Sequence, residues 1–244
     1  MTTTGEVARP PSRGDILVYK ICRFIAVGVS RLYFPGTVSG RENLPTGAYI
    51  VAPVHRSYVD WLIVARITRR RRLRYIVKEE VWKSKLIGRL LVACGAFPVN
   101  RSGADREAIQ RCQSVLEGGE PLVMFPEGTR RSGPEVQELK DGVAYLSLRA
   151  GVPIVPIGIG GSERAMPRGS SFPRPRRVNV VIGTPVPAPR PATTRDAGFS
   201  GAPEEPGASS RRVRVGREMV TEQSTRVRAA IQQAFDLAEK SVSH

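Results

Sequence analysis

The sequence predicts a single α/β domain in which helices flank a mostly parallel or mixed central sheet. Short apolar runs alternate along the chain with helical segments of about 10–15 residues, as in proteins of this class. Hydrophobic residues make up 41% of the 244 residues, enough to form one buried core. An amphipathic helix near the N-terminus and another helix at the C-terminus are expected to flank this domain.

The chain divides into five segments: a disordered lead-in (1–14), an amphipathic helix (15–36), the α/β domain (37–186), a flexible loop (187–211) and a C-terminal helix (212–244). In the first helix, Lys20, Arg23 and Arg31 interrupt the apolar run, so it falls short of the roughly 18 apolar residues of a membrane span. Its cations border a broad apolar face. Packing on the core and lying in a membrane interface both fit this pattern.

Six strands are expected, at residues 48–54, 74–78, 96–101, 121–125, 152–160 and 177–186, because each is a short apolar run bounded by turn residues. Helices are expected between them, at residues 57–70, 84–95, 104–119 and 138–151, and again at 215–240. The third of these has the clearest amphipathic spacing, and Gly118 and Gly119 stop it. The segment 35–47 is rich in turn residues.

The charge balance is the outlier of the composition. The formal net charge is +16 and the sequence pI is about 10.8, which favours polyanionic partners such as nucleic acid or an anionic membrane. No nucleic acid is expected, because no helix-turn-helix, RNP or zinc pattern is present and aromatic residues make up only 6%.

The three cysteines, Cys22, Cys94 and Cys112, lack metal-ligand spacing. They are expected to be small core residues, and no metal is expected.

His55 and Asp60 are the first candidate catalytic pair. His55 follows an expected strand, and Asp60 falls in the first turn of an expected helix, from which a carboxylate can point back at the imidazole. Such a carboxylate fixes the tautomer and leaves the other ring nitrogen free to accept a proton. Because no GxSxG motif is present, the hydroxyl that His55 activates would belong to a substrate. The alternative is a structural histidine.

Two further strand ends deliver polar groups. The turn "FPEGTR" presents Glu127, Gly128, Thr129 and Arg130, where glycine permits close backbone approach and arginine offers a planar fork for a phosphate. Arg101 ends the strand "AFPVNR". Each feature alone also fits a solvated surface turn. Together with His55 they predict one composite site at the ends of neighbouring strands.

The blocks "HRSYVD", "GAFPVNR", "FPEGTR" and "VPIVPIGI" resemble, in order and spacing, those of the glycerolipid acyltransferase family, most closely the bacterial 1-acyl-sn-glycerol-3-phosphate acyltransferases. The resemblance covers residues 40–186. It implies that His55 is a general base oriented by Asp60 in the His-x4-Asp motif. It also implies that Arg101, Glu127, Gly128, Thr129 and Arg130 bind the acceptor's phosphate, with Glu127 holding Arg130, Arg101 or a substrate hydroxyl.

The resemblance further implies transfer of a fatty acyl group from acyl-CoA or acyl-carrier protein to 1-acylglycerol-3-phosphate, giving phosphatidate, with no other cofactor. Lys78 and Lys140 are possible substrate contacts, and Arg70 and Arg71, in the cationic stretch 66–74, are possible contacts of lipid headgroups or CoA phosphates. One departure is Val54, where the family often has asparagine.

Three alternatives stay open. In the first, the protein is an acyltransferase whose acceptor is glycerol-3-phosphate or another lysolipid. In the second, it hydrolyses thioesters. In the third, it is a non-catalytic basic protein that binds lipid or nucleic acid. For the transferase we expect a peripheral or monotopic position at the cytoplasmic face of the cell membrane, an anionic membrane surface as partner, and no obligate protein partner.

Overall fold

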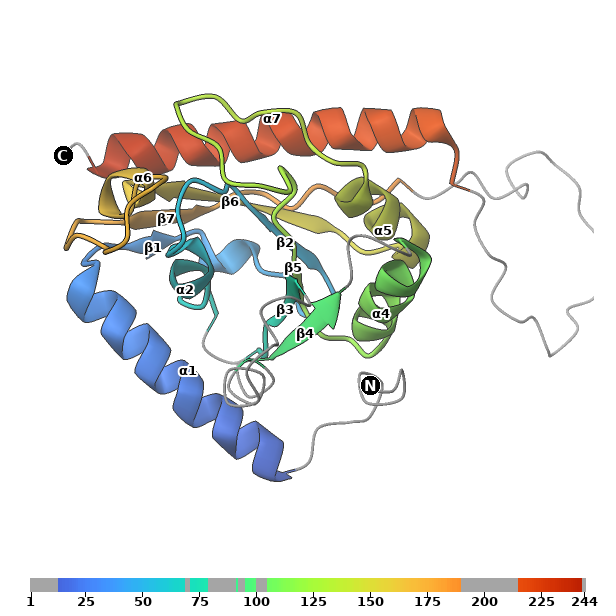
Figure 1. The fold of residues 1–244 in the computed structure, drawn as a ribbon. Coiled ribbons are helices and arrows are strands. Elements are labelled where there is room, and N and C mark those ends of the chain that lie inside the picture. The colour runs from blue at the N-terminus through green and yellow to red at the C-terminus, as the bar shows by residue number, and fades with distance from the viewer. Residues whose placement is uncertain are drawn as a thin grey trace, which may run out of the picture.

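The fold is described from a computed structural model that covers residues 13–68, 71–78, 91, 95–99, 105–189 and 215–242. Its strands are β1 (Val38–Ser39), β2 (Ile50–Pro53), β3 (Arg74–Lys78), β4 (Ala96–Val99), β5 (Leu122–Val123), β6 (Ile154–Gly160) and β7 (Asn179–Ile182). Its helices are α1 (Arg13–Tyr33), η1 (Arg41–Asn43), α2 (Asp60–Val64), α4 (Asp105–Glu117), α5 (Gly142–Ala150), α6 (Ser162–Ala165) and α7 (Arg217–Val242). The predicted fold class is confirmed (Figure 1).

The seven strands form one mixed sheet in the order β1-β7-β6-β2-β5-β3-β4. The strands from β6 to β4 run parallel to one another, β7 runs antiparallel to β6, and β1 runs parallel to β7. Because β5 lies between β2 and β3, the segments that follow β2 and β5 leave the same edge of the sheet side by side. This is the edge at which open α/β folds place their ligands.

Several boundaries differ from the prediction. The helix expected at 57–70 is ordered as α2 only over Asp60–Val64, and the chain after it turns back into β3. Strand β1 lies in the segment expected to be only turns, where it gains its hydrogen bonds from the distant β7. Helix α1 begins at Arg13, so it includes the last two residues of the predicted lead-in 1–14. Residues 1–12, most of the helix expected at 84–95 and most of the loop 187–211 lie outside the described residues.

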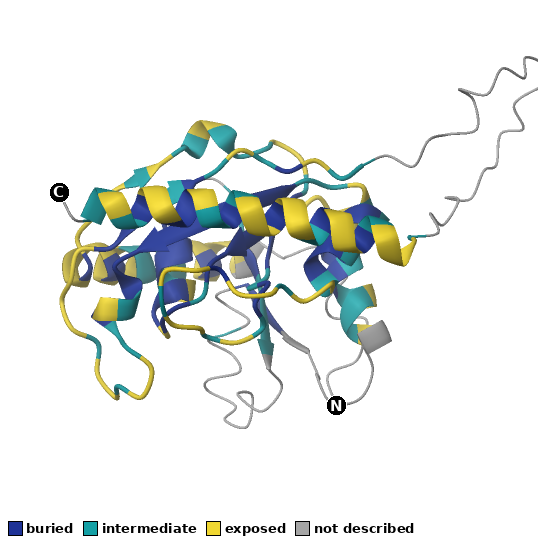
Figure 2. Cartoon of the chain, turned by 90° about the horizontal axis from the view of Figure 1, so that it is seen from above, coloured by how far each residue is buried: buried dark blue, intermediate teal, exposed yellow. Residues whose placement is uncertain are grey.

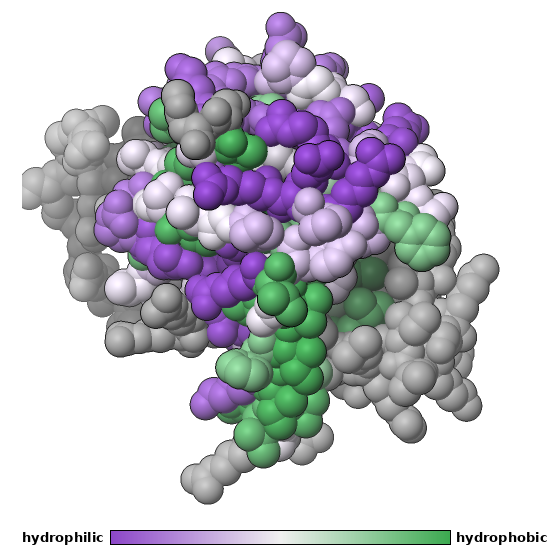
Figure 3. Space-filling model, turned by 90° about the vertical axis from the view of Figure 1, so that its left-hand side faces the viewer, coloured by the Kyte–Doolittle hydropathy of each residue, from purple (hydrophilic) through white to green (hydrophobic). Residues whose placement is uncertain are grey.

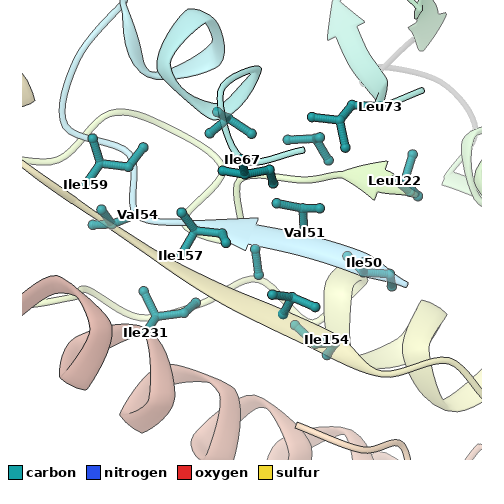
Figure 4. Close-up of a cluster of buried hydrophobic side chains, with 14 of the residues drawn as sticks. Ile50, Val51, Val54, Ile67, Leu73, Leu122, Ile154, Ile157, Ile159 and Ile231 are labelled. Atoms are coloured by element: carbon teal, nitrogen blue, oxygen red, sulfur yellow. The ribbon is translucent and has the colours of Figure 1, made fainter. Parts of the chain in front are cut away.

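Helix α7 covers one face of the sheet together with α5, and α2 and α1 lie on the other (Figure 1). The inner side of α7 is buried and its outer side exposed, as Figure 2 shows. Ile231 of α7 meets Ile157 and its neighbours in the core (Figure 4). At Gly158 and Gly160 the helix backbone comes so close that a Cβ would lie 2.0 Å from the carbonyl oxygen of Ala234 and 2.3 Å from that of Ala238.

Helix α1 packs only partly. Its C-terminal end is fastened by Arg66, whose buried guanidinium donates to the carbonyl oxygens of Phe34 (3.1 Å) and Gly36 (2.6 Å). Desolvation, helped by Arg31 and Arg41, lowers the pKa of Arg66 to about 10. Along the helix, large apolar side chains are exposed: Ile16, Leu17, Val18, Ile21, Phe24, Ile25, Val29, Leu32 and Tyr33. Figure 3 shows them as an apolar band.

The cysteines fit the expected role of core residues in part. Cys112 is buried in α4, and desolvation raises the pKa of its thiol to about 12, so it stays a protonated, unreactive thiol. Cys22 on α1 is half-buried and has no disulfide partner. Cys94 lies outside the described residues.

Candidate active site

His55 lies in the loop between β2 and α2, where its ring meets Asp60. The two residues are joined by a hydrogen bond of 2.9 Å between Nδ1 of His55 and Oδ2 of Asp60. Asp60 is fully buried at the start of α2, whereas the side chain of His55 keeps 20% of its surface exposed. The same Oδ2 accepts the backbone N–H groups of Arg56 and Ser57, each at 2.7 Å. These two donors hold the carboxylate in the direction of the ring.

A carboxylate that accepts from Nδ1–H fixes the tautomer in which Nε2 carries the lone pair. The ring of Phe125 stacks against the imidazole, with centroids 4.1 Å apart and planes tilted by 30°, so the ring plane is held as well. Among the residues that the structure describes, no serine or cysteine side chain hydrogen-bonds the ring. The arrangement is therefore suited to removing a proton from a hydroxyl that a ligand brings.

The turn after β5 packs directly against the His55 loop. Gly128 N donates to Phe125 O at 3.0 Å to close the turn, and Arg131 N donates to His55 O at 2.9 Å. Gly128 has a φ of +69°, which favours glycine. A Cβ there would lie 2.5 Å from Cε of Lys140, so this lysine crosses directly over the turn. The structure thus brings the first and third predicted blocks together.

Glu127 is placed differently from the prediction. Its carboxylate is buried, and both oxygens bind Nη1 of Arg56, at 2.8 and 2.9 Å. The carboxylate also accepts His55 N at 3.0 Å and Gln137 N at 3.2 Å. The structure pairs Glu127 with Arg56 and not with Arg130, and protein donors occupy both carboxylate oxygens. The assignment of Glu127 to phosphate binding stays a prediction, which its burial does not favour.

Arg56 is the main residue that the sequence interpretation missed. Its side chain is 1% exposed. Nε donates to Gly133 O at 3.1 Å, Nη2 to Glu135 O at 2.8 Å, and Nη1 to the Glu127 carboxylate. The only sequence signal was its position next to His55, which a chain with 38 lysines and arginines cannot make distinctive.

Arg130, in the turn beside His55, has a donor that the described residues leave unsatisfied. Its guanidinium carbon lies 3.2 Å from the centroid of the Tyr58 ring, and Tyr58 is half exposed. Nη1 of Arg130 has no hydrogen-bond partner among the described residues, although it is shielded from solvent. A planar fork held flat on an aromatic ring can still donate to an anion at its edge. Thr129 beside it is exposed.

The remaining predicted residues divide into two groups. Arg71 donates to the carbonyl oxygens of Thr46, Gly47 and Gly119. These residues precede β2 and β5, so Arg71 lies at the amino ends of the strands, across the sheet from His55. Arg66 and Arg74 of the same cationic stretch are buried, which corrects its interpretation as one patch for lipid or CoA phosphates. Arg70, Arg101 and the side chain of Lys78 lie outside what the structure describes.

Within the described ranges, no three acidic, histidine or cysteine side chains gather to hold a metal ion. No helix there combines the length and apolar character that crossing a bilayer requires.

Curated proteins that resemble this chain carry one name. The chain is 32% identical over 162 residues to a 1-acyl-sn-glycerol-3-phosphate acyltransferase of Chlamydomonas reinhardtii, covering 64% of this chain but 48% of that protein. It is 28% identical to the 1-acyl-sn-glycerol-3-phosphate acyltransferase of Bacillus subtilis, over 69% of this chain and 82% of the relative. The chain thus spans about half the length of the algal relative.

Among solved structures, the 1-acyl-sn-glycerophosphate acyltransferase of Thermotoga maritima has the same fold, with a TM-score of 0.66 over 95% of this chain and 85% of that one, at 22% identity. The sequence model named Acyltransferase matches residues 36–160, which is half of the chain and contains His55, Asp60 and the turn at 126–131. The chain therefore belongs to the Acyltransferase family.

Proposed function

We propose that this protein transfers a fatty acyl group from an acyl thioester to the free hydroxyl of 1-acylglycerol-3-phosphate, giving phosphatidate. The donor is acyl-CoA or acyl-carrier protein, and no further cofactor takes part. The single observation that carries the proposal is the His55–Asp60 pair beside Arg130, whose guanidinium nitrogen Nη1 has no partner among the described residues. The names of the relatives from Chlamydomonas and Bacillus support the same substrate class.

In the proposed reaction, Nε2 of His55 takes the proton of the acceptor hydroxyl as the oxygen attacks the thioester carbonyl. The carbon–sulfur bond then breaks, and the thiolate leaves with the proton that His55 returns. Asp60 keeps the ring in the required tautomer and stabilises the imidazolium that forms. No acyl-enzyme is formed, because the attacking oxygen belongs to the acceptor.

The acceptor's phosphate is bound by Arg130 and Lys140 in this proposal. Arg130 offers a fork of paired N–H donors, and Lys140 lies over the turn at Gly128. Both cations and the imidazole are presented by segments that leave the same sheet edge. This geometry favours an acceptor that carries its phosphate close to its hydroxyl.

We also propose that the reaction takes place on a membrane, at its cytoplasmic face, with the protein bound as a peripheral or monotopic enzyme. The acceptor and product are bilayer lipids, and α1 exposes a continuous set of large apolar side chains (Figure 3). Apolar patches of this kind mark interaction surfaces. Lys20 and Arg31, the exposed cations among the three that interrupt α1, suit the headgroup region, where basic side chains and apolar faces meet.

The test is release of free thiol from palmitoyl-CoA in detergent micelles, with and without 1-acylglycerol-3-phosphate. We expect acceptor-dependent release from the wild type and a loss of about 10²–10⁴-fold in His55→Ala, the range that a general base contributes. His244→Ala is the matched control, because His244 is the only other histidine in the chain. Its activity should equal that of the wild type.

Other outcomes point to the alternatives. Release that no acceptor accelerates would replace the transferase by a thioester hydrolase. Activity with glycerol-3-phosphate or another lysolipid alone would keep the chemistry and change the acceptor. If none of these substrates reacts but acidic vesicles or nucleic acid bind equally well to wild type and His55→Ala, the protein is a basic binding protein instead.

A further inference from the structure

The segment 164–177, which contains the end of α6 and the loop before β7, carries a concentrated positive charge. Its sequence, "RAMPRGSSFPRPRR", holds five arginines and no acidic residue. Arg164 pairs with Glu239 at 3.1 Å. The other four arginines are exposed, and none has an ion-pair partner among the described residues: Arg168, Arg174, Arg176 and Arg177. This charge is therefore open to an external anion.

An exposed aromatic side chain stands at the middle of this charge. Phe172 is 81% exposed, more than any other large apolar side chain outside α1 in the described part of the chain. In a water-soluble surface loop such exposure has no stabilising role. Aromatic rings flanked by arginines are instead typical of membrane interfaces, where the ring enters the acyl boundary and the cations meet lipid phosphates.

The loop lies on the same side of the molecule as the end of α1. Tyr33 donates from its hydroxyl to Pro173 O at 3.0 Å, and Val178 N donates to Pro35 O at 2.8 Å. Figure 3 looks at this side, which is on the left in Figure 1, and shows hydrophilic side chains directly above the apolar band of α1. The cationic loop and the apolar helix thus form one surface.

The base of the loop also contacts the active-site segments. Ser57, two residues after His55, donates from Oγ to Met166 O at 2.9 Å, and Gly133 N donates to the Glu163 carboxylate at 3.2 Å. The first contact joins the loop to the His55 segment, and the second joins it to the chain that follows the 126–131 turn. A ligand that fixes the position of the loop therefore also affects the position of the candidate active site.

We propose that the segment 164–177 is a second bilayer-docking element, which binds anionic lipid headgroups through its arginines and inserts Phe172 beside α1. A protein held by α1 alone could rotate about the axis of that helix on the membrane. The second contact, through the segment 164–177, removes this freedom and fixes how the active site is oriented relative to the bilayer. Membrane docking by this segment does not depend on the acyl transfer proposed above. Its effect on catalysis does rest on that proposed function.

Binding to phosphatidylcholine vesicles, with and without an equal part of phosphatidylglycerol, tests the proposal by co-sedimentation. The variant combines Arg168→Glu, Arg174→Glu and Arg176→Glu. The control makes the same charge change on the exposed side of α7, with Arg217→Glu, Arg226→Glu and Lys240→Glu. Circular dichroism confirms the fold of each variant.

We expect the loop variant to lose at least tenfold of its partitioning onto anionic vesicles, because one cation near such a surface contributes about fivefold. The control variant should lose far less, and Phe172→Ser should weaken binding to both vesicle types. Equal losses in loop and control variants would overturn the proposal, because the attraction would then come from the net charge. Loss of binding to duplex DNA or RNA, with vesicle binding intact, would make the loop a nucleic-acid contact instead.

Acyl transfer to a short-chain, water-soluble lysophosphatidate separates this proposal from the proposed function. The loop variant should keep wild-type turnover with the soluble acceptor and lose it with the vesicle-bound one. A wild type that transfers no acyl group would contradict the proposed function and leave the vesicle result standing. An equal loss of turnover on both acceptors would show that the loop acts within the site, not through the membrane.

Discussion

Arg56 and Arg130 belong to the two segments that meet at His55, and they have opposite surroundings. Arg56 is buried, and each of its guanidinium nitrogens donates to a protein oxygen: Glu127, Gly133, Glu135 and His55 itself. Arg130 rests on the Tyr58 ring, and its Nη1 lacks a partner in the described structure. The same residue type therefore has two kinds of surroundings here. One arginine holds the loops together, and the other is available to a ligand.

The comparison shows that arginines in a strongly basic chain differ in whether the protein already satisfies their donors. Arg56, Arg66 and Arg71 donate to carbonyl or carboxylate oxygens of the protein, so these donors stabilise the fold and are not open to a ligand. Only a cation whose donors are not satisfied by the protein gains from binding a phosphate. Charge along the sequence is thus a poor guide to the site, and unsatisfied donors are a better one.

The largest effect is expected from Arg56→Met. Removing one partner of a buried ion pair leaves the Glu127 carboxylate without its counterion, which costs about 3–5 kcal/mol of unfolding free energy. Thermal denaturation should show a fall in Tm of about 10 °C or more. An unchanged Tm would mean that Arg56 is not the residue that fastens these loops.

The double variant Arg56→Met with Glu127→Leu separates stability from positioning. Apolar replacement of both charges removes the unpaired carboxylate, so much of the lost Tm should return. Activity should stay low, because the His55 backbone N–H then has no Glu127 oxygen to hold it. Recovery of both Tm and turnover would reduce the pair to a stabilising contact.

The next effect is expected from Arg130→Met. Its Tm should stay near that of the wild type, since the protein gives Nη1 no hydrogen bond to lose. The kcat/KM for 1-acylglycerol-3-phosphate should fall by roughly 10–100-fold, the value of a charge-assisted hydrogen bond or two. For monoacylglycerol, an acceptor without phosphate, the variant and the wild type should react alike. A similar loss with both acceptors would contradict a phosphate-binding role.

The smallest effect is expected from Tyr58→Leu, which removes the ring beneath Arg130 and keeps an apolar side chain. A partly exposed cation–π contact contributes about 0.5–1 kcal/mol, so KM for the phosphate-bearing acceptor should rise by about two- to fivefold. kcat should stay unchanged because Tyr58 takes no part in the hydrogen bond between His55 and Asp60. Tyr58→Phe, which keeps the ring, is the control and should match the wild type.

Much of the fold could be predicted because it depends on local patterns. Six of the seven strands and the two terminal helices follow from apolar runs and helical spacing, which reflect burial on one face of an element. Strand β1 could not be predicted, since its two residues become a strand only by pairing with Val180 and Val181 more than 140 positions away. The shortening of the helix at 57–70 likewise comes from the turn into β3.

The sequence by itself determined the α/β class, the proximity of His55 to Asp60 and the glycine turn at 128, because all three depend on short-range spacing. Only the tertiary structure decided that Glu127 pairs with Arg56, that Arg71 lies at the far end of the strands, and that Nη1 of Arg130 meets no acceptor in the described part of the chain. The physical reason is the order of the strands. Placing β5 beside β2 joins two loops in which Arg56 and Glu127 stand 71 residues apart. Burial between these loops determines which charges must find a partner inside the protein.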